Sequence, residues 1–333
     1  MLNYGSMEII TTDITTLENY LFGQGWLKRD ESILAVESPG AGNMNFTLRI
    51  RTDKGSIIVK QSREYVEKYP QVAAPKDRAL RESEFYMLIA GYDILKKQMP
   101  NLNGVDRDNY VLNLEDLGEG IDYSTLYKEG HALDEGELEE IMVFVANLHN
   151  NIHRGTTNIK LPNREMRKLN HEHIFVFPYL QENGLDLDDV LPGLGAVGNP
   201  FKQDKALWDV LEKLGERYLS DGKTLLHGDY FPGSWLNTND GIKIIDPEFC
   251  FFGEPEFEIG VILAHLKLAA QPKTTTDKAL KIYMDRAPLH KDLCLQFMAV
   301  EILRRLLGLA QLPLSLNLEE RKALLQEARD ILV

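Results

Sequence analysis

One segment, from Leu225 to Glu248, constrains the rest of the chain most, because short apolar runs alternate there with polar turns that carry acidic residues. Asp229 lies on a loop between two apolar runs. Asp246 and Glu248 follow directly after the next run, Ile242 to Ile245. Runs this short, bounded by Gly, Asn and Asp, are typical of strands. The segment therefore predicts two loops with carboxylates, separated by a short strand.

Two such loops are the usual layout of a phosphoryl-transfer site. One carboxylate receives the proton of an attacking hydroxyl, and others hold the magnesium ion that neutralises a triphosphate. Asp229 is thus the candidate base, and Asp246 and Glu248 are candidate magnesium ligands. The hypothesis is an ATP-dependent kinase that acts on a small molecule.

Length and charge narrow the class of protein. A chain of 333 residues exceeds what one hydrophobic core usually supports, so two lobes are expected. The 51 acidic and 37 basic residues give a net charge of -14, which argues against a nucleic-acid partner because a phosphate backbone selects basic surfaces. No apolar run approaches the ~20 residues that span a bilayer, and residues 1–16 show no secretory leader. We expect a cytoplasmic protein without a membrane partner.

Cysteines and histidines do not predict a metal site. Cys250 and Cys294 lie far apart and in no CxxC spacing. His149 and His153 share a helix face, but spacing ties no third ligand to them. Packing or capping roles are expected for both histidines.

Gly193 to Gly198 matches a dinucleotide-binding fingerprint in letters only. No strand leads into it, and Asn199-Pro200 follows where a helix should start. We expect a loop here.

The N-terminal third alternates strand and turn patterns. Strands are expected at residues 32–36, 46–51 and 56–60, and the hairpin turn at residues 53–55 makes them antiparallel. A turn rich in Gly and Asn joins the first two strands, and Lys60 ends the third. A kinase uses this arrangement to place backbone N–H groups over the phosphates and to direct one ammonium to them.

Four residues of the Gly-rich turn are candidate nucleotide-binding residues. Gly40 and Gly42 permit close backbone approach, and Asn43 and Asn45 can hydrogen-bond within the turn. The pattern alone leaves open that this is an ordinary hairpin.

A helix is expected over residues 78–88, with Glu82 and Glu84 on it. Either carboxylate could pair with Lys60 and fix its ammonium, or lie on a solvated face. Periodicity does not choose between them.

The strand at residues 109–114 ends at Glu115-Asp-Leu117, where backbone groups could read an adenine edge. From Asp134 the pattern is helical, and apolar periodicity predicts a buried helix over residues 137–153. Further helices are expected at residues 205–220, 257–268, 278–285, 289–309 and 318–332. We therefore predict a nucleotide-binding lobe over residues 1–115 and a catalytic, substrate-binding lobe over residues 116–333.

In order along the chain, these segments resemble the aminoglycoside phosphotransferase and choline kinase superfamily, and within it the branch of the 5-methylthioribose kinases. The matching segments are Gly40 to Asn45, Val59-Lys-Gln61, Tyr65-Val66, Asp77-Arg-Ala79 with Glu82, Glu115-Asp-Leu117, His227-Gly-Asp229, Gly233-Ser234, Asp246-Pro-Glu-Phe249 and Glu301 to Ala310. The resemblance covers both expected lobes.

The resemblance implies an α+β, bilobal, protein-kinase-like fold, with an antiparallel sheet and a helix in the small lobe and mainly helices in the larger one. It implies ATP and Mg2+ as cofactors and a small-molecule hydroxyl as acceptor. Lys60 would hold the phosphates, Glu82 rather than Glu84 would position it, and Glu115 and Leu117 would bind the nucleotide. A homodimer is an option on family analogy alone.

Ser234 stands where most of the superfamily has a metal-binding asparagine. In the methylthioribose kinase branch, Gly-Ser at this point is followed by Asp-Pro-Glu. The resemblance therefore implies a metal site of Ser234, Asp246 and Glu248, whose oxygens a hard cation accepts.

Arg304 and Arg305 bear most on the acceptor. Adjacent helical residues point about 100° apart, so both face one spot only where the helix distorts or ends. The resemblance associates the pair with sugar binding and with the transferred phosphoryl group, whose developing charge a cation near Asp229 would stabilise. The alternative for each arginine is an ion pair with a carboxylate.

Three departures from the branch fall in the substrate lobe: residues 170–178 look shortened, Glu258 replaces an aspartate, and Glu254-Pro-Glu256 replaces a more apolar run. They leave the acceptor open. A hydroxyl of 5-methylthioribose or a related sugar is favoured over the cationic acceptor of an aminoglycoside or choline phosphotransferase, which the arginines would oppose. A third reading, based on Ser234, is a catalytically silent ATP-binding pseudokinase.

Overall fold

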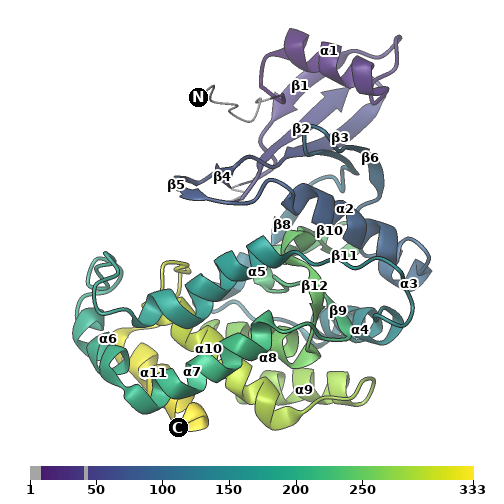
Figure 1. The fold of residues 1–333 in the computed structure, drawn as a ribbon. Coiled ribbons are helices and arrows are strands. Elements are labelled where there is room, and N and C mark those ends of the chain that lie inside the picture. The colour runs from purple at the N-terminus through teal and green to yellow at the C-terminus, as the bar shows by residue number, and fades with distance from the viewer. Residues whose placement is uncertain (1–8, 41–43) are drawn as a thin grey trace.

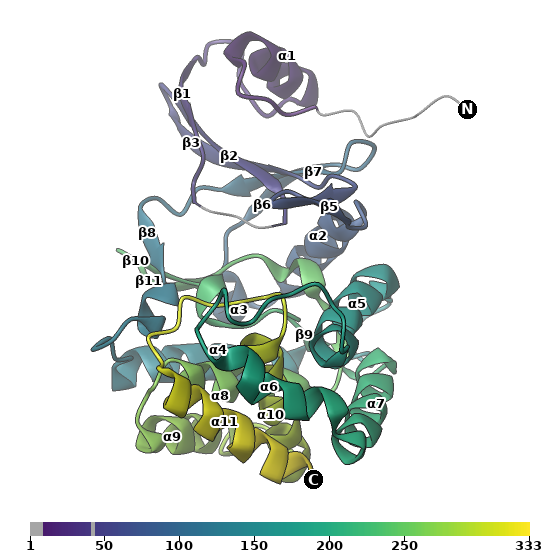
Figure 2. The same ribbon diagram turned by 90° about the vertical axis from the view of Figure 1, so that its left-hand side faces the viewer.

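The computed structural model describes residues 9–40 and 44–333. It confirms the predicted α+β architecture, with a small antiparallel sheet in the N-terminal part and a larger, mainly helical C-terminal part (Figures 1 and 2). Within the described ranges, no helix is long and apolar enough to cross a membrane.

The N-terminal sheet has five strands in the order β1-β2-β3-β7-β6. Their bounds are β1 Ile33–Glu37, β2 Phe46–Thr52, β3 Gly55–Gln61, β6 Leu102–Asp106 and β7 Val111–Glu115. Helix α1 (Ile14–Gln24) covers one face and ends at Gly25, whose left-handed conformation (φ 72°) favours glycine. A small apolar core lies between α1 and the sheet, and Leu21, Ile50 and Val59 are fully buried in it. The predicted antiparallel order of the first three strands is confirmed.

Helix α2 (Arg78–Ile89) lies on the opposite side of the sheet from α1, facing the C-terminal part (Figure 2). Its apolar side chains, including Phe85 and Ile89, belong to the large core that continues through the C-terminal helices. A hairpin, β4 (Tyr65–Val66) and β5 (Tyr69–Ala73), precedes α2, and the short helix α3 (Asp93–Lys96) follows it.

The C-terminal part consists of helices and two small sheets. The helices are η1 Tyr123–Tyr127, α4 Glu135–Asn151, α5 Arg164–His171, α6 Leu194–Gln203, α7 Lys205–Leu219, α8 Pro255–Leu268, α9 Lys273–Met284, α10 Lys291–Leu307 and α11 Leu318–Leu332. One sheet has the order β11-β10-β8 (Gly241–Ile244, Trp235–Thr238, Gly120–Asp122), and the other pairs β12 (Phe251–Gly253) with β9 (Thr224–Leu226). The five predicted C-terminal helices and the helix over residues 137–153 are confirmed, with shifted ends.

The expected loop at residues 193–198 was wrong, because most of it is the start of α6. The capping group comes from outside the segment: the carboxylate of Asp188 accepts the N–H groups of Gly193 and Gly195 at 3.0 and 2.8 Å. Burial of Leu194 and Phe201 stabilises a helix that Pro200 would otherwise disfavour.

Candidate active site

The Asp229 loop follows strand β9 and is fixed by two tight contacts. Gly228 has φ +87°, and a Cβ atom there would lie 2.2 Å from the carbonyl oxygen of Phe249, so the position requires glycine. The buried carboxylate of Glu258 on α8 accepts the N–H groups of His227 and Gly228 at 3.1 and 2.7 Å. The sequence marked Glu258 only as a departure, and the structure shows that it anchors the loop.

Asp229 lies among charged groups at the inner edge of this loop. Burial raises the pKa of Asp229 to about 7, although Arg305 and Arg304 act in the opposite direction. A carboxylate that titrates near neutral pH is suited to accept a proton from a hydroxyl.

Asp246 follows the small sheet in a strained conformation, with φ 63° although Pro247 comes next. The residue before a proline normally avoids helical backbone, so the turn must be held by its surroundings. Lys60 contributes directly, since its ammonium lies 2.7 Å from Asp246 Oδ1.

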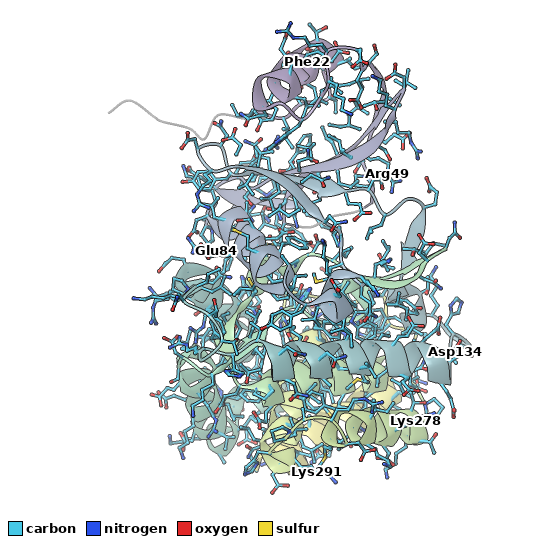
Figure 3. The ribbon with its side chains drawn as sticks, turned by 90° about the vertical axis from the view of Figure 1, so that its right-hand side faces the viewer. Phe22, Arg49, Glu84, Asp134, Lys278 and Lys291 are labelled. Atoms are coloured by element: carbon cyan, nitrogen blue, oxygen red, sulfur yellow. The ribbon has the colours of Figure 1, made fainter. Side chains whose placement is uncertain are left out.

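Lys60 is also 2.8 Å from Glu82, and both side chains are buried. Burial disfavours the charged lysine, but Asp246 and Glu82 raise its pKa, so it stays protonated. Glu84 instead binds Arg81 at 2.7 Å, on the outer side of α2 (Figure 3). The structure thus brings Lys60 together with Glu82 and with Asp246.

Glu248 faces a buried polar cluster. It accepts a hydrogen bond from Asn45 Nδ2 at 2.7 Å and lies 3.4 Å from Arg78 Nε. Asn45 Oδ1 accepts from Ser62 Oγ and Arg78 Nε at 2.9 and 2.8 Å. The amide of Asn45 therefore joins the end of the Gly-rich turn to the Asp246–Glu248 turn, whereas hydrogen bonding within its own turn was expected. Arg78, to which the sequence assigned no role, is fully buried in this cluster.

Ser234 connects the two acidic loops. Its hydroxyl donates to the carbonyl oxygen of Asp229 at 2.7 Å, and its carbonyl accepts from the N–H of Ile245 at 3.1 Å. The hydroxyl hydrogen is thereby used, while the oxygen keeps its lone pairs.

The donor set suits a magnesium ion that is bound partly through substrate phosphates. The side chain of Asp246 is 49 % exposed and can offer an oxygen, while Ser234 and Glu248 are buried beside it. In the described part of the chain, no group of three or more His, Cys, Asp or Glu side chains is arranged to hold a metal alone. Mg2+ commonly takes one or two carboxylates and completes its shell with water and phosphate oxygens.

The nucleotide-binding candidates are only partly described. Gly40 is exposed and has space around it, while Gly42 and Asn43 lie outside the described residues. Glu115 ends β7, its N–H is bonded to the carbonyl of Asn101, and its carboxylate accepts from the same residue. Leu117 follows, partly buried.

Arg49 of strand β2 stabilises the segment around Leu117. Its guanidinium lies 3.0 Å from the buried Asp116 and donates to the carbonyl of Gly118 at 2.6 Å. Figure 3 shows where Arg49 lies in the N-terminal sheet.

Arg304 and Arg305 both bind the buried carboxylate of Glu301. Arg304 Nη1 lies 3.1 and 3.0 Å from its two oxygens, and Arg305 Nε donates to Oε1 at 2.6 Å. Glu301 sits three and four residues earlier on α10, so it lies between the two diverging side chains. Both arginines therefore form the ion pair that was the alternative for each of them. Their positive charges also lower the pKa of Asp229 against the effect of burial.

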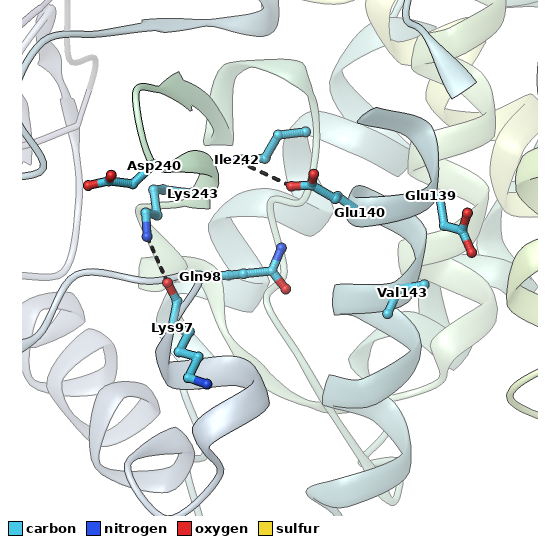
Figure 4. A pocket seen from close by; sticks show the side chains of 8 residues that line it. All are labelled: Lys97, Gln98, Glu139, Glu140, Val143, Asp240, Ile242 and Lys243. Atoms are coloured by element: carbon cyan, nitrogen blue, oxygen red, sulfur yellow. Dashed lines mark hydrogen bonds between the residues drawn. The ribbon is translucent and has the colours of Figure 1, made fainter. Parts of the chain in front are cut away.

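Two cavities lie away from these residues. One, of about 520 Å³, lies between α3, α4 and β11 and is lined by Lys97, Glu140 and Lys243, among others (Figure 4). The other, of about 1010 Å³, lies between the segment after α5 and helix α7, with Trp208 in its wall. Neither is lined by Lys60, Asp229 or Asp246.

Comparison with known proteins gives one family. A family described as the phosphotransferase enzyme family matches residues 36–284. Similar curated proteins include methylthioribose kinase 1 of Oryza sativa subsp. japonica, 25 % identical over 71 % of this chain, and the methylthioribose kinase of Bacillus cereus (strain B4264), 26 % identical over 78 % of it. The aligned segments span 56 % and 66 % of these relatives' own lengths.

Solved structures share the fold. A choline kinase from Cryptosporidium parvum Iowa II superimposes with a TM-score of 0.57 at 12 % identity, covering 96 % of this chain and 95 % of its own. A microcompartment-associated aminopropanol kinase gives 0.52 at 14 % identity, covering 95 % of each chain. At these identities the likeness concerns the fold.

Proposed function

The chain belongs to the phosphotransferase enzyme family, and from this premise we propose that it is a magnesium- and ATP-dependent kinase that phosphorylates a hydroxyl of a small molecule. The observation that carries the proposal is the convergence of two sets of residues. Lys60 is paired with Glu82 and Asp246, and Ser234 joins the Asp246 turn to the loop that carries Asp229, because its carbonyl accepts from Ile245 and its hydroxyl donates to Asp229. The first set suits the phosphates of a nucleotide, and the second suits an acceptor.

In the proposed reaction, Asp229 orients the acceptor hydroxyl and takes its proton. The hydroxyl oxygen forms a bond to the γ-phosphorus, and the bond from that phosphorus to the β-phosphate oxygen breaks, which releases ADP. Lys60 anchors the α- and β-phosphates and is itself held by Glu82.

Asp246, with Ser234 and Glu248, would hold magnesium, which supplies charge neutralisation at the phosphates. Because Glu248 is already bound to Asn45 and Arg78, Asp246 would be the principal ligand. The backbone at Glu115 and Leu117 would bind the adenine, and the Gly-rich turn with Gly40 would cover the phosphates.

For the acceptor, we propose a hydroxyl of 5-methylthioribose or of a related sugar. Two observations support this choice: the curated relatives carry the name methylthioribose kinase, and Arg305, which shares Glu301 with Arg304, lies 5.1 Å over the ring of Phe231, two residues after Asp229. A cationic acceptor such as choline or an aminoglycoside would meet the same arginines and be repelled.

The test is acceptor-dependent ADP release, measured with Mg-ATP over 5-methylthioribose, other ribose derivatives, choline and an aminoglycoside. Turnover with a sugar is expected, and Asp229→Asn should lower kcat by about 10²–10⁴-fold. Asp277→Asn, which changes an exposed aspartate on α9, is the matched control and should keep full activity. Turnover with choline or the aminoglycoside alone would overturn the acceptor, and Mg-ATP binding without any turnover would favour a pseudokinase.

A further inference from the structure

Behind the arginine pair lies a chain of buried hydrogen bonds. Tyr127 Oη lies 2.5 Å from His265 Nδ1, and His265 Nε2 lies 3.2 Å from Glu301 Oε1. All three residues are at most 1 % exposed. Burial lowers the pKa of His265 to about 4, so its ring is neutral. One tautomer then satisfies both contacts: Nε2–H donates to Glu301, and Nδ1 accepts from the tyrosine hydroxyl.

A second buried series of hydrogen bonds, also made of a tyrosine, a histidine and a glutamate, supports the loop that carries Asp229. Tyr283 Oη lies 2.8 Å from His149 Nδ1, and His149 Nε2 lies 3.0 Å from Glu258 Oε2. Glu258 in turn binds the backbone of the loop that carries Asp229. Glu258 and His265 are seven residues apart on α8, which places them on one face of that helix. Helix α8 thus contributes one member to each Tyr–His–Glu chain.

The hydrogen bonds through His265 support Glu301, whose role goes beyond packing. Glu301 binds three donor residues, and without it two guanidinium groups would stand unpaired in a buried site. Arg305 is further held over the ring of Phe231, at 5.1 Å, and by the carbonyl of Ala310. The arginines are therefore fixed in direction.

We propose that Glu301, supported from behind by His265 and Tyr127, is a positioning residue of the acceptor site, which gathers Arg304 and Arg305 into one cluster behind Phe231 of the loop that carries Asp229. Two arginines and one glutamate leave one net positive charge in this cluster, which balances the charge of Asp229 when that carboxyl is ionised to accept a proton. The site is then neutral, which favours an uncharged polyhydroxy acceptor over a cation. This inference rests on the proposed function and extends it to residues that do not touch the acceptor.

The experiment compares the full chain with its Glu301→Gln variant. Steady-state kinetics give kcat and the KM values for 5-methylthioribose and for ATP of each protein. We expect the KM for 5-methylthioribose to rise about tenfold, the size of one charged hydrogen bond, while the KM for ATP stays unchanged. Glu327→Gln, which removes an exposed carboxylate paired with Lys267, is the control and should change neither. An unchanged KM for 5-methylthioribose, or an equal rise in the KM for ATP, overturns the proposal.

Tyr127→Phe provides a milder second variant. It removes one hydroxyl and no charge, so we expect the KM for 5-methylthioribose to rise about threefold. A KM equal to that of the unmodified chain contradicts the role of the hydrogen bonds behind Glu301. The proposed function fails if the unmodified chain phosphorylates no acceptor, whereas this inference fails if the sugar is phosphorylated and the variants leave its KM unchanged.

Discussion

At the scale of single residues, Asp229, the proposed base, carries a cost in stability. Its pKa in the folded chain is about 7, above the ordinary value of 3.8, because burial disfavours the ionised form. A carboxyl whose pKa is raised by folding contributes stability that is present below about pH 3.8 and is lost as the pH rises through about 7. Asp229→Asn imitates the protonated form. We expect this variant to be more stable than the unmodified chain at pH 8, by about 1–3 kcal/mol.

The measurement is urea unfolding of both proteins between pH 5 and pH 8.5. The difference in the free energy of unfolding should be smallest at pH 5, grow up to about pH 7 and stay constant above it. Asp277→Asn again serves as the control, because its carboxylate is exposed. A difference that is independent of pH would mean that Asp229 does not titrate near 7 in the folded chain.

Sequence reasoning reached some of these residues and missed others for a physical reason. Asp229 and Asp246 lie within one short segment, so the two loops that carry them could be predicted from the sequence pattern. The partners of Asn45 and of the arginines could not, because they depend on contacts across the fold: Asn45 binds a carboxylate 203 positions away. Arg78 lies in a segment that matches the family, but its burial could not be predicted, since a buried arginine has the same sequence pattern as an exposed one.

At the scale of elements, the position of α2 depends on Arg78 at its first turn. The guanidinium donates to the carbonyls of Met44, Arg63, Pro75 and Tyr65 at 2.7–3.3 Å and to Asn45, and it lies beside Glu248. A lysine has three donors on one atom and cannot reproduce this fork. Arg78→Lys should therefore lower the free energy of unfolding by about 2–4 kcal/mol and raise the KM for ATP.

Both effects can be checked by urea unfolding and by steady-state kinetics at saturating acceptor. Arg81→Lys is the matched variant on the same helix: its ion pairs with Asp77 and Glu84 are nearer the surface, so less than about 1 kcal/mol should be lost. Equal losses for the two variants would show that the buried cluster does not hold α2.

Long helices such as α4 and α10 could be predicted well, because apolar residues recur at helical spacing along their buried face. Helix α6 could not, since its cap is supplied by Asp188 and its packing by distant helices. The short strands β8 and β12 are likewise defined by partners far along the chain.

At the scale of the whole molecule, the two lobes share a hydrophobic core. Phe85 and Ile89 of α2, with Leu112 and Leu114 of β7, belong to the same buried cluster as the C-terminal helices. Only the smaller core under α1 is confined to the N-terminal sheet. The predicted division at residues 115 and 116 therefore cuts through this common core.

Residues 1–115 produced alone should for this reason lack a stable fold. In the fragment, the large apolar side chains of α2 and β7 would be exposed to water. Each of them loses about 1.5–3 kcal/mol of burial free energy. A few such losses equal the entire free energy of unfolding of a typical domain, about 5–15 kcal/mol. We expect the fragment to show no cooperative urea transition by circular dichroism and poorly dispersed amide resonances, whereas residues 1–333 unfold in a transition that includes α2. A fragment that unfolds cooperatively would show instead that the N-terminal lobe is an independent domain, with the core under α1 sufficient to sustain it.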